Sequence, residues 1–298
     1  MISMMMRAVK ASLSRVRAGL KTRPSSRVFV GGCLLSVVVC LAADNRQPTT
    51  DNHSPRRIVT LAPNLTEILF AIGAGDRIVA TDDFSDSPAA AKALPKVGGM
   101  EPNIERIVAM KPDLVLASSS ANVTALRSAQ LPLEVIKTDR LEDVARVMAS
   151  LGAELHAPNA SAAARAVRDG LAKQRRKRAH PPRILFAAWN QPLYVGGRET
   201  FIDDLFKLCG AENAVQVTGW PQYAVESVVA APPDIVLHSS RLDIEPLLRA
   251  APELRTKSRI IPIDENRFTR PGPHVVDAAA NLNAIIDEWE KRSVSKSH

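Results

Sequence analysis

The sequence lacks the short motifs that accompany common catalytic and cofactor sites. It contains no G-x-S-x-G segment, no phosphate-binding P-loop and no G-x-G-x-x-G fingerprint. The nearest glycine cluster, Gly73-Ala74-Gly75, lacks the third glycine and follows a helical pattern instead of a strand. None of the six histidines is paired at the spacing of zinc ligands. We therefore expect no catalytic residue, no metal site and no cofactor, and a protein that is not an enzyme.

Cysteine is nearly absent as well. Cys33 and Cys40 lie within the first 43 residues, which leaves Cys209 as the only cysteine in the rest of the chain. A single thiol cannot form an internal disulfide. Cys209 continues an apolar pattern with Phe201 and Leu205, so we predict a buried structural cysteine and not a nucleophile.

Acidic residues are missing from the first 43 positions, which carry seven Lys and Arg side chains. An apolar run from Val28 to Ala43 follows the basic stretch and ends directly before Asp44. This order is typical of an export signal peptide, and the run is shorter than the roughly 20 residues that span a membrane. The alternatives are an uncleaved membrane anchor and a lipid attached to Cys40.

Removal of the predicted signal peptide also removes most of the net charge. The whole chain has 39 Lys and Arg against 31 Asp and Glu, so 32 basic and 31 acidic residues remain after the first 43. A net charge this close to zero gives no electrostatic argument for nucleic acid. We therefore expect no nucleic-acid partner.

Strand-like and helix-like patterns alternate along the rest of the chain. Short β-branched runs such as Ile58–Leu61 and Ile184–Ala188 are followed by amphipathic segments, which predicts an α/β fold with mainly parallel sheets. Asn64, with Glu67 three residues later, fits the cap of the first helix. The predicted organisation is a signal peptide (1–43), a flexible tether (44–55), an N-terminal lobe (56–156), a long linking helix (157–180), a C-terminal lobe (181–291) and a tail (292–298).

One segment of the chain occurs twice. Residues 104–119 (IERIVAMKPDLVLASS) and 225–240 (VESVVAAPPDIVLHSS) are identical at nine of 16 positions, without a gap, at an offset of 121 residues. We interpret them as one helix–turn–strand unit used once in each lobe. The alternative is two generic helix–strand joints of independent origin.

Each copy of the repeat contains an acidic residue at the same place, Glu105 and Glu226. A matched pair of exposed carboxylates, one per lobe, fits a partner that offers two similar basic pockets. The alternative is an acid in the first turn of a helix, where the helix dipole stabilises it. Spacing alone does not separate these two interpretations.

Aromatic residues make up only 4% of the chain, but several of them follow predicted strands. In an open α/β sheet the carboxyl ends of the strands face the ligand crevice, where aromatic side chains provide flat apolar surface. We interpret the group as the lining of a cleft between the lobes; the alternative is that each residue packs beneath its own loop. The residues are Phe84, Trp189, Tyr194, Trp220, Tyr223 and Phe268.

Several segments resemble one family of proteins. The resemblance extends from about Arg57 to about Trp289 and is most specific in GGMEPNIERIVAMKPDLVLA (98–117). Five further segments match in order and spacing: RIVTLAPNLTEILFAIG (57–73), DDFSDSP (82–88), WNQPLYVGGRETFIDDLFKLCGAEN (189–213), GWPQYAVESVVAAPPDIVL (219–237) and RFTRPGPHVVDAAANL (267–282). The chain therefore resembles the class III periplasmic binding proteins of ABC importers, and among them the members that bind vitamin B12 (cobalamin).

The resemblance implies two α/β lobes joined by one rigid helix, with a flat ligand held edge-on between the lobes. It implies a monomer in the periplasm that captures cobalamin or a related corrinoid and delivers it to an ABC permease dimer in the inner membrane. It also implies that Glu105 and Glu226 meet arginines of that permease. The residues that correspond to ligand contacts of the family are Pro63, Asn64, Phe84, Trp189, Tyr194, Trp220, Asn266, Arg267, Phe268, Thr269 and Arg270.

Two departures from the cobalamin-binding members leave other ligands open. Ala117-Ser118-Ser119 replaces a tryptophan, and Asn266-Arg267-Phe268 stands where those members have Asp-Trp-Phe. Arg267 and Arg270 fit the carboxylates of haem or of a ferric siderophore, whereas DDFSDSP lacks the Tyr or His that would ligate haem iron. An α/β enzyme that uses the cleft and a membrane-anchored structural protein are the remaining alternatives.

Overall fold

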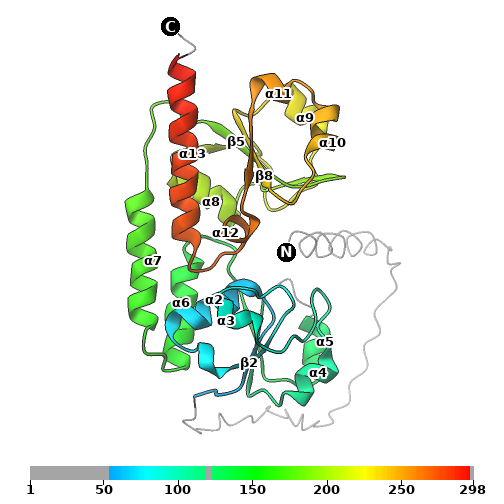
Figure 1. Cartoon of the computed structure of the whole chain (residues 1–298), viewed down its shortest axis with the longest axis vertical. Coiled ribbons are helices and arrows are strands. Elements are labelled where there is room, and N and C mark those ends of the chain that lie inside the picture. Colours follow the sequence, from blue (N-terminus) through cyan, green and yellow to red (C-terminus); the bar gives the residue numbers. More distant parts are fainter. Residues whose placement is uncertain (1–53, 119–122, 296–298) are drawn as a thin grey trace, which may run out of the picture.

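The computed structural model describes residues 54–118 and 123–295, which form two α/β lobes, one above the other in Figure 1. The predicted signal peptide and most of the predicted tether lie outside these residues. The last two tether residues, Ser54 and Pro55, belong to the N-terminal lobe, because the Ser54 hydroxyl donates a hydrogen bond to the Leu155 carbonyl (2.8 Å). Within the described ranges, no helix combines the length and apolar character needed to cross a membrane.

The N-terminal lobe contains a four-stranded sheet in which every pair of strands is parallel. Its order is β2-β1-β3-β4, made of β1 (Ile58–Thr60), β2 (Ile78–Thr81), β3 (Leu114–Ser118) and β4 (Leu133–Ile136). The helical elements of this lobe are α2 (Pro63–Ile72), η1 (Gly75–Arg77), α3 (Ala89–Lys92), α4 (Ile104–Ala109), α5 (Val123–Ser128) and α6 (Asp143–Glu154). The strands consist mostly of aliphatic residues because helices cover both faces of the sheet.

The C-terminal lobe repeats this plan with one antiparallel edge. Its strands are β5 (Arg183–Asn190), β6 (Leu193–Val195), β7 (Glu212–Asn213), β8 (Ile235–Ser239) and β9 (Arg259–Ile263), in the order β6-β5-β8-β9 with β7 beside β5. Only the β5–β6 pair of the described strands is antiparallel. The helices are α8 (Phe201–Leu208), α9 (Val225–Ala230), α10 (Glu245–Ala250), α11 (Leu254–Lys257), α12 (Glu265–Thr269) and α13 (Val275–Ser295). The prediction of an α/β fold with mainly parallel sheets is confirmed.

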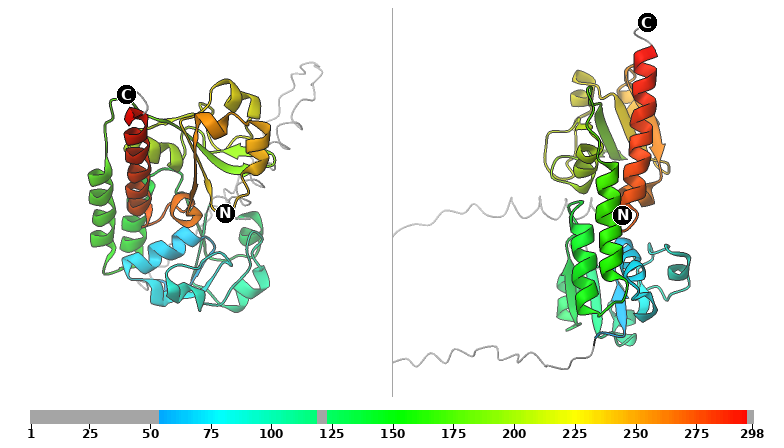
Figure 2. Two further views of the ribbon diagram at one scale, coloured as in Figure 1. Left: turned by 45° about the horizontal axis from the view of Figure 1, so that its top comes forward. Right: turned by 90° about the vertical axis from the view of Figure 1, so that its left-hand side faces the viewer.

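The linking helix is shorter than the predicted 157–180. Helix α7 covers Ala160–Gln174, and Arg175 then adopts an extended backbone (φ −60°, ψ 128°) that leads toward β5. Helices α7 and α13 pack side by side along one flank of the molecule (Figure 2). Gly170 permits this approach, because a Cβ atom there would lie 2.8 Å from Val276 Cγ1. Helix α13 also continues to Ser295, so the predicted tail begins later than residue 292.

One hydrophobic core runs through both lobes. The same cluster of buried side chains includes Leu69 of α2, Ala164 of α7, Leu205 of α8 and Ala279 of α13. Two smaller clusters cover the other face of each sheet. Cys209 is buried in the shared core, as predicted, and burial raises the pKa of its thiol to about 12. A thiol held protonated in this way is a poor nucleophile.

The duplicated segment forms the same unit in each lobe, as predicted. Helix α4 and strand β3 correspond to α9 and β8 at the offset of 121 residues. Asp113 Oδ1 accepts a hydrogen bond from the backbone N–H of Arg57 (2.8 Å), and Asp234 Oδ2 accepts one from Arg183 (2.7 Å). Each repeated aspartate therefore aligns its own strand with the neighbouring strand of the sheet.

Replacing Asp234 by Ala should lower the free energy of unfolding by about 1–3 kcal/mol, because the Arg183 N–H loses a charged acceptor. Urea denaturation followed by circular dichroism measures this loss. Asp169→Ala on the exposed side of α7 is the control and should change stability by less than about 0.5 kcal/mol. Equal stability of the Asp234 and Asp169 variants would contradict the assigned role.

The predicted cap of the first helix is wrong. The N-cap of α2 is Ala62, without a side-chain cap, and Pro63 occupies the first turn. The Asn64 side chain instead donates hydrogen bonds to Thr138 Oγ1 (3.0 Å) and to the Pro271 carbonyl of the other lobe (3.3 Å). Asn64 and Glu67 therefore serve contacts across the chain and not the local helix end.

Candidate functional site

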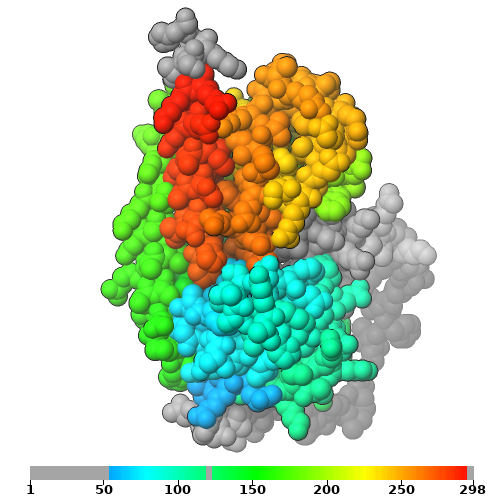
Figure 3. Space-filling view, viewed as in Figure 1, coloured from blue at the N-terminus to red at the C-terminus, as the bar shows by residue number. Residues whose placement is uncertain are grey.

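Loops that follow the carboxyl ends of strands in the two sheets meet between the lobes. Arg270 follows β9 and α12 in the C-terminal lobe and reaches the N-terminal lobe, where its Nη2 donates a hydrogen bond to the Phe84 carbonyl (3.2 Å). Phe84 lies in the loop after β2. Figure 3 shows the α12 region in orange resting on the cyan surface of the N-terminal lobe. The loop ends of both sheets thus form one region, where a ligand would touch both lobes.

Arg270 is the centre of a buried ion-pair network between the lobes. Its Nη1 donates hydrogen bonds to Glu67 Oε1 (3.1 Å) and to Asp86 Oδ1 (2.7 Å). Burial raises the pKa of Glu67, although the hydrogen bond and charge of Arg270 oppose the rise. Burial also tends to raise the pKa of Asp86. The hydrogen bond and the charge of Arg270 outweigh this effect, so the pKa of Asp86 is lowered. The network holds the lobes in a fixed relation on one side of the region between them.

A second ion pair joins the lobes beside the C-terminal half of α7. Arg140, in the loop after β4, donates from Nε and Nη2 to the two carboxylate oxygens of Asp204 on α8 (2.7 and 2.6 Å). The Leu141 backbone N–H adds a third bond to Asp204 (3.1 Å). A bidentate arginine–carboxylate pair fixes orientation as well as distance. The two lobes are therefore joined at two separate places.

The loop that carries Phe84 is held by buried polar groups. The Ser85 hydroxyl donates to Asp82 Oδ1 and lies 2.8 Å from the Thr66 hydroxyl. Lys96 Nζ donates to the Ser85 carbonyl (2.6 Å). Burial raises the pKa of Asp82 to about 6, against the hydrogen bond from Ser85 and the charge of Lys96. This network fixes the backbone from which the Phe84 ring projects.

Two of the predicted aromatic residues are exposed large apolar side chains. Phe84 is 37% exposed and Trp189, at the end of β5, is 38% exposed. Trp220 is half-buried and makes an edge-to-face contact with Phe186 (centroids 6.1 Å apart, planes at 78°). Tyr194 is buried in β6 opposite Trp189. Each lobe therefore presents one exposed aromatic ring, at or just after the carboxyl end of a strand.

The predicted contact residues of α12 differ in their exposure. Phe268 and Thr269 are buried, so neither side chain reaches a ligand while α12 keeps this position. Thr269 Oγ1 donates to the Glu265 carbonyl (2.7 Å). Asn266 is half-buried, and Arg267 is exposed with a loose ion pair to Asp264 (3.4 Å). Of this set, Asn266 and Arg267 remain accessible.

Comparison with known proteins assigns the chain to a family. Residues 58–260 match the family model described as periplasmic binding protein. The chain belongs to the periplasmic binding protein family. The vitamin B12-binding protein of Pectobacterium atrosepticum is 29% identical over 249 residues, which cover 78% of this chain and 89% of that protein. The vitamin B12-binding protein of Yersinia pestis is also 29% identical, over 78% of this chain and 87% of its own length.

Solved structures of periplasmic binding proteins have the same fold. The haem-binding protein of a Roseiflexus species superposes with a TM-score of 0.69 at 26% identity, over 78% of this chain and 98% of its own. The vitamin B12-binding protein of Vibrio cholerae superposes with a TM-score of 0.70 at 24% identity, over 80% and 99%. The relatives of this periplasmic binding protein are thus substrate-binding proteins and not enzymes.

The two glutamates of the repeat occupy equivalent exposed positions. Glu105 is in the first turn of α4 and Glu226 is in the first turn of α9. Figure 1 places α4 and α9 in different lobes, on the side of the molecule opposite α7 and α13. The two helices that carry the glutamates therefore lie on the same side of the molecule.

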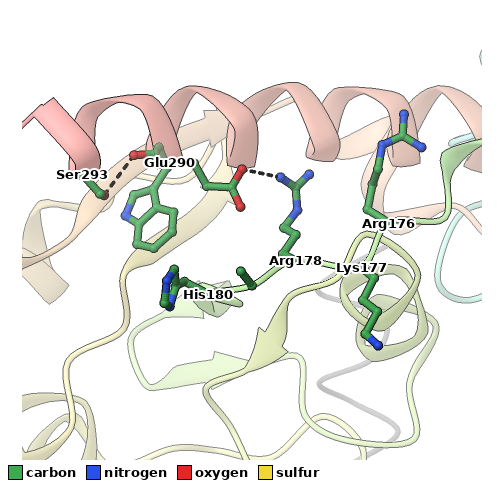
Figure 4. Close-up of a pocket in the computed structure, with 8 residues that line it drawn as sticks. Arg176, Lys177, Arg178, His180, Glu290 and Ser293 are labelled. Atoms are coloured by element: carbon green, nitrogen blue, oxygen red, sulfur yellow. Dashed lines mark hydrogen bonds and ion pairs between the residues drawn. The ribbon is translucent and has the colours of Figure 1, made fainter.

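A separate hollow of about 660 Å³ lies beside α13, between that helix and residues 176–180 (Figure 4). Its Arg178 is already engaged, since Nη1 pairs with Asp287 (2.7 Å) and Glu290 (2.9 Å). Figure 4 shows Arg176 and Lys177 directed away from each other, so the cations do not converge. None of the predicted site residues lines this hollow. Across the described ranges, no group of three His, Cys, Asp or Glu side chains is placed to hold a metal ion.

Glu67 and Asp86 were missed as members of the region between the lobes. Local spacing predicts a helix cap for Glu67, whereas its partner in the structure, Arg270, is 203 residues away in the sequence. Gly272 marks the close approach, because a Cβ atom there would lie 3.0 Å from Glu67 Oε2. The sequence did contain one signal, the three acidic residues around Phe84 in Asp82-Asp83-Phe84-Ser85-Asp86. Buried carboxylates need a cation nearby, so this run predicts a basic partner if the loop is buried.

Proposed function

We propose that this periplasmic binding protein captures cobalamin or a related corrinoid and delivers it to an ABC permease. The observation that carries this proposal is the pair of exposed rings, Phe84 in the loop after β2 and Trp189 near the carboxyl end of β5, which belong to different lobes. A corrin is a broad flat ring with apolar faces, and aromatic side chains in two opposing lobes suit such a ligand. The relatives named as vitamin B12-binding proteins support the same ligand.

Two observations support the delivery step: the chain belongs to the periplasmic binding protein family, and its two lobes carry matched exposed glutamates. Glu105 and Glu226 are proposed to dock on basic pockets in the two subunits of the permease, and the ligand region between the lobes would then open toward the transport path. We propose that the chain acts as a periplasmic monomer after removal of residues 1–43. Neither step requires catalysis by this chain.

Haem is the second candidate, because haem-binding proteins are among the structural relatives and Arg267 is accessible. The carboxylates of haem would pair with Arg267, whereas the neutral amides of cobalamin need no cation. Replacing Arg267 by Gln would therefore weaken haem binding and leave cobalamin binding nearly unchanged.

The ligand is tested by calorimetric titration of the purified protein with cyanocobalamin, haem and a ferric siderophore. Cyanocobalamin should bind with one equivalent, and Phe84→Ala should weaken it about tenfold or more, as expected when an aromatic contact is truncated. Phe84→Tyr keeps the ring and should retain most of the affinity. Saturation by haem without any heat from cyanocobalamin would reject the corrinoid assignment in favour of haem.

A further inference from the structure

Six of the nine identical positions of the two repeat copies fall into two groups. Three have a structural role in both lobes: the aspartates align neighbouring strands, and the paired Val and Leu residues of β3 and β8 are buried. Three others are exposed in both copies and lie on α4 and α9. They are Glu105, Val108 and Ala109 in one lobe and Glu226, Val229 and Ala230 in the other.

The two valines are the most unusual members of the exposed group. Val108 is 48% exposed and Val229 is 39% exposed. Valine has only a modest preference for helices, so neither burial nor helix propensity accounts for its presence there. One exposed valine on a surface needs no explanation. Two exposed valines at equivalent positions of a duplicated helix do need an explanation, because neither contributes to the packing of its lobe.

Each valine lies three residues after its glutamate and therefore on the same helix face. The intervening exposed position is not matched, since Arg106 stands opposite Ser227. Arg106 also has a partner within its own lobe, the Lys96 carbonyl (3.1 Å). The matched surface thus consists of one carboxylate and an adjoining apolar patch, presented once by each lobe.

We propose that Val108 with Ala109, and Val229 with Ala230, are apolar docking contacts for the same partner that Glu105 and Glu226 engage. This inference rests on the proposed delivery function and extends it. The partner is a membrane protein with two-fold symmetry, and each of its subunits offers a basic pocket flanked by apolar side chains. Duplicated side chains in the two lobes match duplicated subunits in the partner.

The test measures association of the ligand-loaded protein with its ABC permease in lipid nanodiscs by surface plasmon resonance. Val108→Ser and Val229→Ser should each weaken docking about fivefold, as expected for burial of part of a valine side chain, and the double variant about 25-fold. The loss should appear in the dissociation rate, with an unchanged dependence of the association rate on salt, because no charge is altered. Ligand affinity should not change.

Val217→Ser is the matched control, because Val217 is 53% exposed and lies outside α4 and α9. It should dock like the parent. Parent-like docking by the Val108/Val229 double variant, or a loss of its ligand affinity, would overturn the inference. The glutamate variants test the proposed delivery function separately. If they dock normally while the valine variants do not, the apolar docking contacts are supported and the proposed role of the carboxylates is wrong.

Discussion

Replacing Arg270 by Met is expected to lower the free energy of unfolding by about 3–5 kcal/mol, which is the usual cost of removing one member of a buried ion pair. The guanidinium joins Glu67 and Asp86 of the other lobe and also donates to the Phe84 carbonyl. Glu67 Oε2 is buried and already lacks a hydrogen-bond partner among the residues that the structure describes. Without Arg270 the whole Glu67 carboxylate would lie uncompensated between the lobes.

The deficit of the Arg270 variant should depend on pH. Burial raises the pKa of Glu67 above its ordinary value of 4.5, and Arg270 opposes that rise, so the variant should have a still higher folded-state pKa. A carboxyl with a raised folded-state pKa contributes stability at low pH, and that contribution is lost as the pH rises through the folded-state pKa. Thermal denaturation should therefore show a larger deficit at pH 8 than at pH 5.

Two further variants separate charge from packing. Arg267→Ala, three residues away and exposed, should change stability by less than about 0.5 kcal/mol. The double variant Arg270→Met with Glu67→Leu removes both buried charges and should regain much of the loss. A deficit below about 1 kcal/mol for Arg270→Met would mean that the network contributes little to holding the lobes together.

Reversing both glutamates, Glu105→Lys with Glu226→Lys, should abolish association with the permease. Each reversal is expected to cost about 2–4 kcal/mol of docking free energy, or roughly 30- to 1,000-fold in Kd, because a pair of opposite charges becomes a pair of like charges. Both side chains are exposed, so folding should be unaffected. Cobalamin affinity should remain within about twofold of the parent, since neither residue follows the carboxyl end of a strand.

Charge reversal elsewhere provides the control for this result. Glu142→Lys with Glu199→Lys changes one exposed acid in each lobe, away from α4 and α9. This control should dock nearly as well as the parent at physiological salt, where the Debye length is about 8 Å. Equal losses in both double variants would point to the overall charge of the protein and not to two specific pockets.

Much of the fold could be predicted because its signals are local. The β-branched runs became strands, and the repeat led directly to the correspondence of α4 and β3 with α9 and β8. Strand β6 was missed because three residues in an antiparallel edge give too short a pattern. The end of α7 was placed too late because Arg175, Arg176 and Lys177 suit a helix, and it is the extended backbone at Arg175 that ends it.

The candidate site was less predictable because its contacts join distant residues. Resemblance pointed to Arg270 as a ligand contact, but the structure pairs it with Glu67 and Asp86. Phe268 was expected at the surface because it is aromatic and lies in a loop region, yet it completes the core beneath α12. Side chains that bridge two lobes depend on how the lobes meet, and local periodicity carries no information on that.

The core that passes through both lobes has a consequence for cargo release. Leu69 and Leu205 belong to one buried cluster, so spreading the lobes would expose apolar side chains to water at a cost of about 25 cal/mol per Å². Emptying the protein by spreading its lobes would therefore require an outside source of free energy, and a transporter that binds both lobes at once could provide it through the contacts it makes.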